Sequence, residues 1–136
     1  MQVTSLDHLV LTVRNVEVTC AFYERVLGMS IISFGGGRKA LGFGSQKINL
    51  HELGQEFEPK AGQPTPGSAD LCFLIDSPLA EFAEQLKTQR VAIVEGPVQR
   101  TGARGAIRSI YFRDPDVNLI EVSVYESLDS KPTQGG

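Results

Sequence analysis

The chain has 136 residues, of which 41% are hydrophobic and 21% charged, and its net charge is −3. These values are typical of one globular domain and exclude wholesale disorder. The slight negative charge argues against a protein that binds nucleic acid or an anionic membrane. No apolar run approaches the ~20 residues of a membrane span, and no signal peptide is visible. We therefore expect a cytoplasmic protein whose Cys20 and Cys72 stay reduced.

The first part of the chain predicts one helix among four strands. Residues 5–13 are β-rich and place Leu9, Leu11 and Val13 on one face of a strand. Asn15 is suited to cap a helix that runs to Leu27, where Gly28 would end it. Short runs separated by glycine-rich turns then predict strands over 29–34, 38–43 and 47–51.

The same plan starts again after a polar, proline-rich linker over 53–67. A strand is predicted over 68–75, and Ser77 followed by Pro78 is a typical helix opening, with the helix ending near Gln89. Further strands are predicted over 91–94, 106–113 and 118–125. This gives module one over about 5–52, module two over about 68–126, and a frayed tail over 127–136.

The repeated order of one strand, one helix and three strands predicts an α+β fold of two βαβββ modules. In each module the helix covers one face of the sheet and leaves the other face open. Two such sheets can join into a half-open barrel with the helices outside and a concave cleft inside. Because paired modules leave sheet edges and helix faces to cover, we also expect a homodimer.

Strand alternation predicts which side chains face this cleft, because neighbouring residues of a strand point to opposite faces. The residues opposite the apolar face of their strand are His8, Asn49, His51, Asp70, Cys72, Glu121, Ser123 and Tyr125. Each of these side chains could also have a purely structural role; Asp70, for example, could form an ion pair with Arg108. Together, however, imidazole and carboxylate groups are the ligands that divalent ions take in proteins.

The two ends of the domain resemble the vicinal oxygen chelate superfamily, which holds glyoxalase I, extradiol dioxygenases, fosfomycin-resistance transferases and bleomycin-binding proteins. The resemblance covers about residues 5–126 and is carried by Leu6-Asp-His-Leu-Val-Leu-Thr-Val13 and by Tyr111-Phe-Arg-Asp-Pro-Asp-Val-Asn-Leu-Ile-Glu121. The closing segment is similar to the family's F-x-D-P-D-G-x-x-I-E ending. The middle of the chain is most similar to the subgroup of glyoxalase domain-containing protein 5 and its bacterial relatives.

This resemblance implies a divalent metal ion (Mn, Mg, Fe, Zn or Ni) held by residues of the first, fourth, fifth and eighth strands. His8 and Glu121 match the first and last of these positions, and Asn49 or His51 matches the fourth-strand position. The fifth-strand ligand is usually His, and here it is Asp70. Since Asp is shorter, the ion would shift toward that strand, bind through a water, or be absent. The change also disfavours an extradiol dioxygenase, whose iron takes two His and one carboxylate.

The leading interpretation is a metal-dependent lyase or isomerase that chelates two neighbouring oxygens of a small carbonyl substrate and stabilises an enolate. Glu121, His51 or Asp70 would move the proton. The alternatives are a metal-free binding protein of the bleomycin-resistance type, an extradiol-dioxygenase-like enzyme, and a thiol enzyme based on Cys72. Further candidates for substrate binding are Arg104, Arg108, Cys72 and Tyr125, the two arginines in a glycine-rich loop at the cleft mouth.

Overall fold

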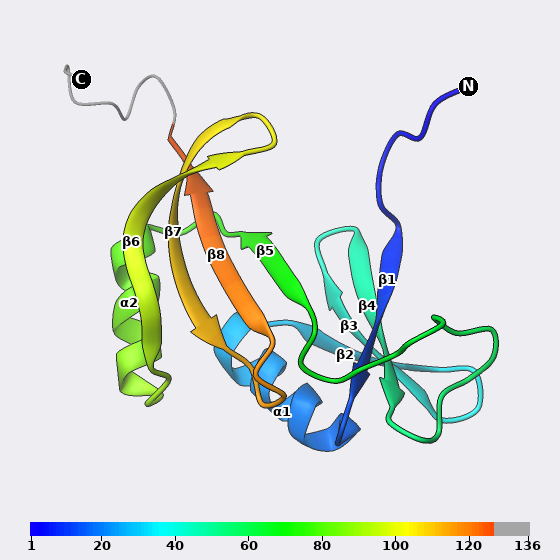
Figure 1. Ribbon diagram of the computed structural model, residues 1–136. Coiled ribbons are helices and arrows are strands. Elements are labelled where there is room, and N and C mark those ends of the chain that lie inside the picture. Colours follow the sequence, from blue (N-terminus) through cyan, green and yellow to red (C-terminus); the bar gives the residue numbers. More distant parts are fainter. Residues whose placement is uncertain (127–136) are drawn as a thin grey trace, which may run out of the picture. The chain divides into compact units, whose positions relative to one another are not determined.

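The computed structural model describes residues 1–126, and the predicted tail over 127–136 lies outside the described residues (Figure 1). The chain divides into two compact units. Unit 1 comprises residues 1–69 and 114–118, and unit 2 comprises 70–113 and the chain from 119 onward. Within the described residues, no helix has the length and apolar character needed to cross a bilayer.

Unit 1 contains a four-stranded mixed sheet and one helix. Its strands lie in the order β1-β4-β3-β2, with β1 parallel to β4 and the other neighbours antiparallel. The elements are β1 (His8–Val13), α1 (Val16–Leu27), β2 (Ser30–Phe34), β3 (Arg38–Phe43) and β4 (Gln46–Glu52).

The bounds of α1 follow from its caps, as the sequence predicted. The Asn15 side chain accepts a hydrogen bond from the Val18 N–H at 2.9 Å, which satisfies one of the unpaired donors of the first turn. Gly28 ends the helix with a φ of 66°, in the left-handed region that glycine adopts without strain. The face with Tyr23 and Val26 is buried in the core of the unit.

Unit 2 repeats this plan with a sheet of order β5-β8-β7-β6. Its elements are β5 (Asp70–Leu74), α2 (Leu79–Thr88), β6 (Ile93–Gly102), β7 (Gly105–Arg113) and β8 (Leu119–Tyr125). Phe82 of α2 packs on Phe112 of β7, with their ring centroids 6.0 Å apart. The α+β class and both βαβββ modules are thus confirmed.

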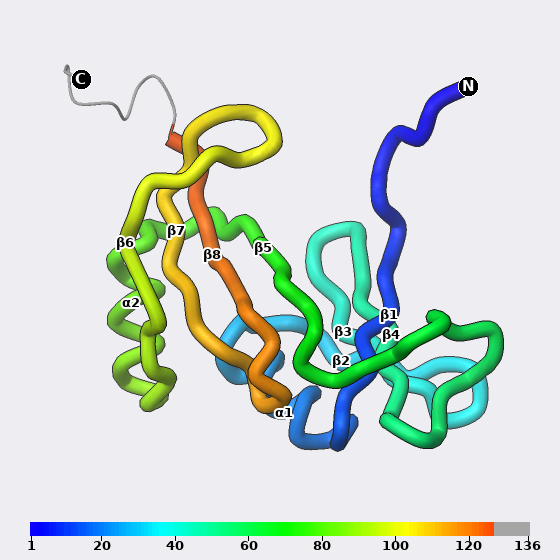
Figure 2. Tube along the Cα trace, viewed as in Figure 1, coloured from blue at the N-terminus to red at the C-terminus, as the bar shows by residue number. Residues whose placement is uncertain are grey.

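Two local predictions in unit 2 are wrong. The strand predicted over 91–94 is the start of the ten-residue β6. The rest of β6, which leads into the glycine-rich segment expected to be a loop, pairs with β7 in a long hairpin (Figure 2). Gly96 and Pro97 resemble a turn in the sequence, but they form an irregularity in the β6–β7 pairing between Glu95 and Val98. At the start of α2, Pro78 and not Ser77 is the cap residue, and no side chain caps the helix.

The turn over 114–118 lies between β7 and β8 yet belongs to unit 1, because its side chains bond to that unit. The buried Asp114 carboxylate accepts a hydrogen bond from the Tyr23 hydroxyl at 2.6 Å. It also accepts from the backbone N–H groups of Asp116 and Asn118, at 2.8 and 3.0 Å. Burial, followed by the Asp114 carboxylate, raises the pKa of Tyr23. The Asp-Pro-Asp motif therefore has a structural role in unit 1.

Candidate functional site

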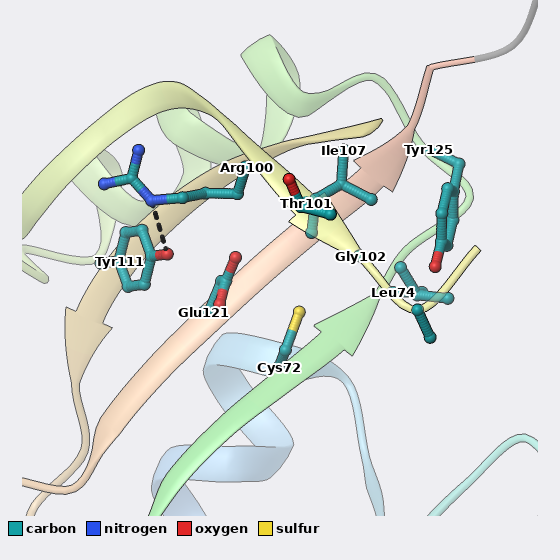
Figure 3. Close-up of a pocket in the computed structure, with 10 residues that line it drawn as sticks. Cys72, Leu74, Arg100, Thr101, Gly102, Ile107, Tyr111, Glu121 and Tyr125 are labelled. Carbon is teal, nitrogen blue, oxygen red and sulfur yellow. Dashed lines mark hydrogen bonds between the residues drawn. The ribbon is translucent and has the colours of Figure 1, made fainter. Parts of the chain in front are cut away.

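The open face of the unit 2 sheet carries a pocket of about 440 Å³ (Figure 3). Glu121 lines this pocket, and β8 pairs Glu121 with Cys72 of β5 on one side and with Tyr111 of β7 on the other. Residues that are partners in a ladder share a face, so all three side chains lie on one side of the sheet. The pocket is lined by Cys72, Leu74, Arg100, Thr101, Gly102, Ala103, Ile107, Tyr111, Glu121 and Tyr125.

Two buried serines fix the Glu121 carboxylate. The Ser109 hydroxyl donates to Glu121 Oε2 at 2.5 Å, and the Ser123 hydroxyl lies 3.4 Å from the same oxygen. The two serine oxygens are 2.7 Å apart, and both residues are fully buried. Hydrogen bonds to a charged acceptor are stronger than neutral ones. The carboxylate is therefore held in one orientation beside the pocket.

Arg100 and Tyr111 form a second polar group in the same pocket. The Arg100 Nε–H donates to the Tyr111 hydroxyl oxygen at 3.1 Å, and its Nη2 donates to Glu95 Oε2, also at 3.1 Å. Burial raises the pKa of the Tyr111 phenol, the hydrogen bond from Arg100 opposes this, and the Glu121 carboxylate adds to the rise. The phenol is therefore protonated at neutral pH.

Cys72 is in the pocket but is poorly suited to be a nucleophile. Its Sγ lies 3.3 Å from the Ser123 hydroxyl oxygen. Burial raises the pKa of the thiol, the hydrogen bond with Ser123 partly opposes this, and the carboxylates of Glu121 and Asp70 add to the rise. Since the thiolate is the reactive form, these surroundings disfavour a thiol enzyme.

The three other residues predicted to bind substrate have different positions. Tyr125 lines the pocket, and its hydroxyl oxygen accepts a hydrogen bond from the Arg104 backbone N–H at 2.9 Å. The Arg104 guanidinium lies over the Tyr125 ring, 4.2 Å from its centroid, so Arg104 holds the tyrosine in place. Arg108 does not line this pocket, because strand alternation puts it on the opposite face from Ile107 and Ser109.

The candidate residues of unit 1 also share one face of a sheet. His8 is exposed and its Nδ1 lies 2.8 Å from Asp7 Oδ1, whereas Asn49 and His51 are buried. Thr12 and His51 are partners in the β1–β4 ladder. A smaller pocket, of about 210 Å³, is lined by Val10, Thr12, His51, Pro59, Lys60, Ala61 and Pro64.

His51 is a buried residue that lines this smaller pocket. Burial lowers the pKa of its imidazole, and the positive charge of Arg38 lowers it further. Its Nε2 has no hydrogen-bond partner, and among the described residues the same holds for only two other buried side-chain atoms, Arg38 Nε and Asn49 Oδ1. The edge of Phe57 lies against the imidazole, with ring centroids 5.7 Å apart.

The predicted metal ligands are divided between the units: His8, Asn49 and His51 in unit 1, Asp70 and Glu121 in unit 2. Neither unit, over the described residues, gathers three His, Cys, Asp or Glu side chains that could hold an ion by themselves. Asp70 is exposed and is the ladder partner of Leu119, so Cys72 and not Asp70 stands beside Glu121. The convergence of His8, Asp70 and Glu121 on one ion stays a prediction.

Tyr111 and Ser109, the two β7 residues beside Glu121, were not among the residues predicted from the sequence. Both lie on β7, and the period of two along that strand already places them on the face of Ile107. The signal was therefore present in the sequence. What it lacked was the register that makes Tyr111 and Ser109 neighbours of Glu121 and Ser123.

Comparison with known proteins identifies the family of the chain. The family model of the Glyoxalase/Bleomycin resistance protein/Dioxygenase superfamily matches residues 5–122. The chain belongs to this superfamily. It is 59% identical to glyoxalase domain-containing protein RDO1 of Mycosarcoma maydis, covering 93% of this chain and 71% of the relative. It is 57% identical to virulence protein STM3117 of Salmonella typhimurium, covering 92% and 87%.

Solved structures share the fold. An integron cassette protein from the mobile metagenome of V. cholerae is 61% identical, with a TM-score of 0.91 over 93% of this chain and 98% of the other. At 23% identity, the fosfomycin resistance protein FosX of Listeria monocytogenes, complexed with Mn(II) and sulfate, has a TM-score of 0.64 over 95% of both chains. The antibiotic-binding protein TnmS3 of Streptomyces has a TM-score of 0.73 at 20% identity, over 93% and 99%. These last two show the fold alone.

Proposed function

We propose that this protein is a metal-dependent lyase or isomerase of the glyoxalase-like class, acting on a small carbonyl compound with two neighbouring oxygens. The observation that carries the proposal is the oriented carboxylate of Glu121, fixed by Ser109 inside a pocket that is large enough for a small substrate. This carboxylate is at the position where the superfamily motif has its metal-binding glutamate.

The residues that would hold the proposed ion are His8, Asp70 and Glu121, with Asn49 or His51 as a further ligand. When bound, a divalent ion supplies Lewis-acid polarisation of the substrate oxygens. The donor set fits such an ion, since it combines imidazole with carboxylates whose charges balance two positive charges. Ser109 also fits this role, because it binds Oε2 of Glu121 and so orients the carboxylate.

The protein's own groups then differ in what they can do with a proton. Glu121 is the leading candidate for the base, because it lines the pocket. His51 is neutral, as a base must be, but its Nε2 is buried. Asp70 is exposed to solvent at the start of β5 and can serve as a ligand or as a proton carrier.

The test is thermal unfolding after dialysis against EDTA, followed by addition of Mn²⁺ or Zn²⁺. An ion that binds only the folded state stabilises it by RT ln(1 + [L]/Kd), about 2.7 kcal/mol at a hundredfold excess over Kd. We expect this shift in the wild type, and we expect Glu121→Gln to lose it. Glu84→Gln, on the exposed face of α2, removes the same charge and should keep it. No metal-induced shift in the wild type would overturn the proposal.

A metal-free binding protein is the second candidate, and the apolar part of the pocket favours it. Leu74, Ile107 and Tyr125 provide a surface that can pack against an apolar ligand without any metal. This alternative predicts the same binding of a hydrophobic dye or drug before and after EDTA treatment, with no change on Glu121→Gln. The homodimer is a separate proposal, and sedimentation velocity tests it directly.

A further inference from the structure

The pocket of unit 2 has a polar end and an apolar end. Because ladder partners share a face, the side chains of β5, β8 and β7 form rows across the open face of the sheet. The row of Cys72, Glu121 and Tyr111 is polar. Further along β8, Tyr125 pairs with Ile107 and forms an apolar row. The Cα atoms of Glu121 and Tyr125 are about 13 Å apart at the usual rise of a strand.

Leu74 of β5 completes the apolar end. It lines the pocket together with Ile107 and Tyr125, and Figure 3 shows Leu74 and Tyr125 at the end of the pocket away from Tyr111. Leu74 is 54% exposed, so much of its apolar surface is in contact with solvent. Its ladder partner Ser123 is fully buried and offers no polar group at this surface. A ligand that covers Leu74 therefore gains affinity by apolar contact.

The wall formed by Tyr125 is fixed before any ligand enters. Its hydroxyl oxygen accepts from the Arg104 backbone N–H at 2.9 Å, and the Arg104 guanidinium carbon lies 4.2 Å from the centroid of its ring. Gly102 allows this close packing, because a Cβ there would lie 2.8 Å from the Tyr125 hydroxyl oxygen and 2.9 Å from Ile107 Cγ2. A preformed wall costs a ligand little entropy of ordering.

The size of the pocket indicates a ligand that reaches both ends. Its volume is about 440 Å³, within the range of pockets that hold drug-sized molecules. A compound that consists only of two neighbouring oxygens and their carbons would occupy the polar end beside Glu121 and leave Leu74 in contact with solvent. The apolar end would then be unused.

We propose that the substrate of this pocket carries an apolar tail of about five carbons or more, alkyl or aryl, which packs on Leu74, Ile107 and Tyr125 while its carbonyl group lies beside Glu121. This inference rests on the proposed function, since it names the substrate class of the same pocket. Each CH₂ group that leaves water for an apolar surface strengthens binding about fourfold. Binding energy from such a remote part of the substrate can serve to orient its reacting end.

The probes are pyruvate, 2-oxooctanoate and octanoate, each titrated by calorimetry into the full chain with one equivalent of Mn²⁺. Pyruvate and 2-oxooctanoate share the 2-oxo acid group and differ in the length of the tail, whereas octanoate has the tail without the 2-oxo group. We expect 2-oxooctanoate to bind at least about thirtyfold more tightly than pyruvate. Octanoate should bind more weakly than 2-oxooctanoate, because it lacks the oxygen next to the carboxylate.

Two variants locate the tail. Leu74→Ser should reduce the advantage of 2-oxooctanoate over pyruvate about fivefold or more, with pyruvate affinity within about twofold of the wild type. Gly102→Val should reduce the same advantage, since its side chain displaces Tyr125 and Ile107. The matched control is Val94→Ser, which removes an apolar side chain that is 52% exposed on β6 outside this pocket, and it should leave all three affinities unchanged.

The outcomes separate this inference from the proposed function. With Mn²⁺ bound to the wild type, equal affinity for pyruvate and 2-oxooctanoate, or equal affinity for octanoate and 2-oxooctanoate, overturns the inference and leaves the metal-dependent enzyme in place. Failure of the wild type to bind Mn²⁺ overturns the proposed function. The titrations are then made in metal-free protein, where no advantage of 2-oxooctanoate, or one that Leu74→Ser retains, overturns the inference as well. If Gly102→Val does not fold, Leu74→Ser, at an exposed position, decides the matter.

Discussion

Val117 is a β-branched residue in a backbone conformation that disfavours it, and replacing it should stabilise the protein. Its φ is 61°, in the left-handed region, where the superfamily ending has glycine. A non-glycine residue there costs about 1–2 kcal/mol. The side chain is 61% exposed, so its removal loses little buried area. Glycine returns about 0.4–1 kcal/mol through the greater entropy of the unfolded chain. Val117→Gly should therefore raise the free energy of unfolding by about 0.5–1 kcal/mol.

Urea unfolding followed by circular dichroism measures this difference, and a thermal scan should show a rise of about 2–4 °C. Val117→Asn should also stabilise, because asparagine adopts the left-handed region more readily than valine and adds less unfolded-state entropy than glycine. Val117→Ala keeps a Cβ and should stay closer to the wild type. A lower unfolding midpoint in both the Gly and Asn variants would show that packing of the valine, and not backbone strain, dominates at this position.

Two further predictions concern titration. His51 has a lower pKa in the folded than in the unfolded state, so the unfolded state binds more protons below about pH 6.5. The free energy of unfolding should therefore fall as the pH drops through that range. His51→Gln should flatten this part of the pH–stability curve, and an unchanged curve would contradict the argument from burial. Burial and neighbouring carboxylates raise the pKa of the Cys72 thiol, so iodoacetamide at pH 7.5 should modify it more slowly than it modifies free cysteine. Mass spectrometry follows the reaction, and a faster rate than that of free cysteine would favour the thiol enzyme again.

Local signals in the sequence were sufficient for most of the fold. Asn15 and Gly28 define α1 because a cap and a left-handed glycine act within one turn of the helix. Likewise, the period of two places Cys72, Glu121 and Tyr125 on the open face of their sheet without any knowledge of the partner strands. These features depend only on neighbouring residues.

What could not be predicted depends on residues far apart in the chain. The extent of β6 follows from pairing with β7, which overrides the turn-like Gly96-Pro97 pair. The burial of His51 follows from the segment around Pro59 and Phe57, which lies on the sheet only in the folded state. The contact between Arg100 and Tyr111 depends on the register between β6 and β7.

Because the turn over 114–118 belongs to unit 1, the chain cannot be cut between its two halves without removing part of that unit. A fragment that ends at residue 69 contains every strand and the helix of unit 1, yet it lacks the Asp114 carboxylate that accepts from the fully buried Tyr23 hydroxyl. Leaving such a hydroxyl unpaired costs about 1–3 kcal/mol, a large part of the stability of a small domain. The first half of the gene should therefore not give a stable product by itself, and an intact Asp-Pro-Asp segment supplied on a second fragment should restore it.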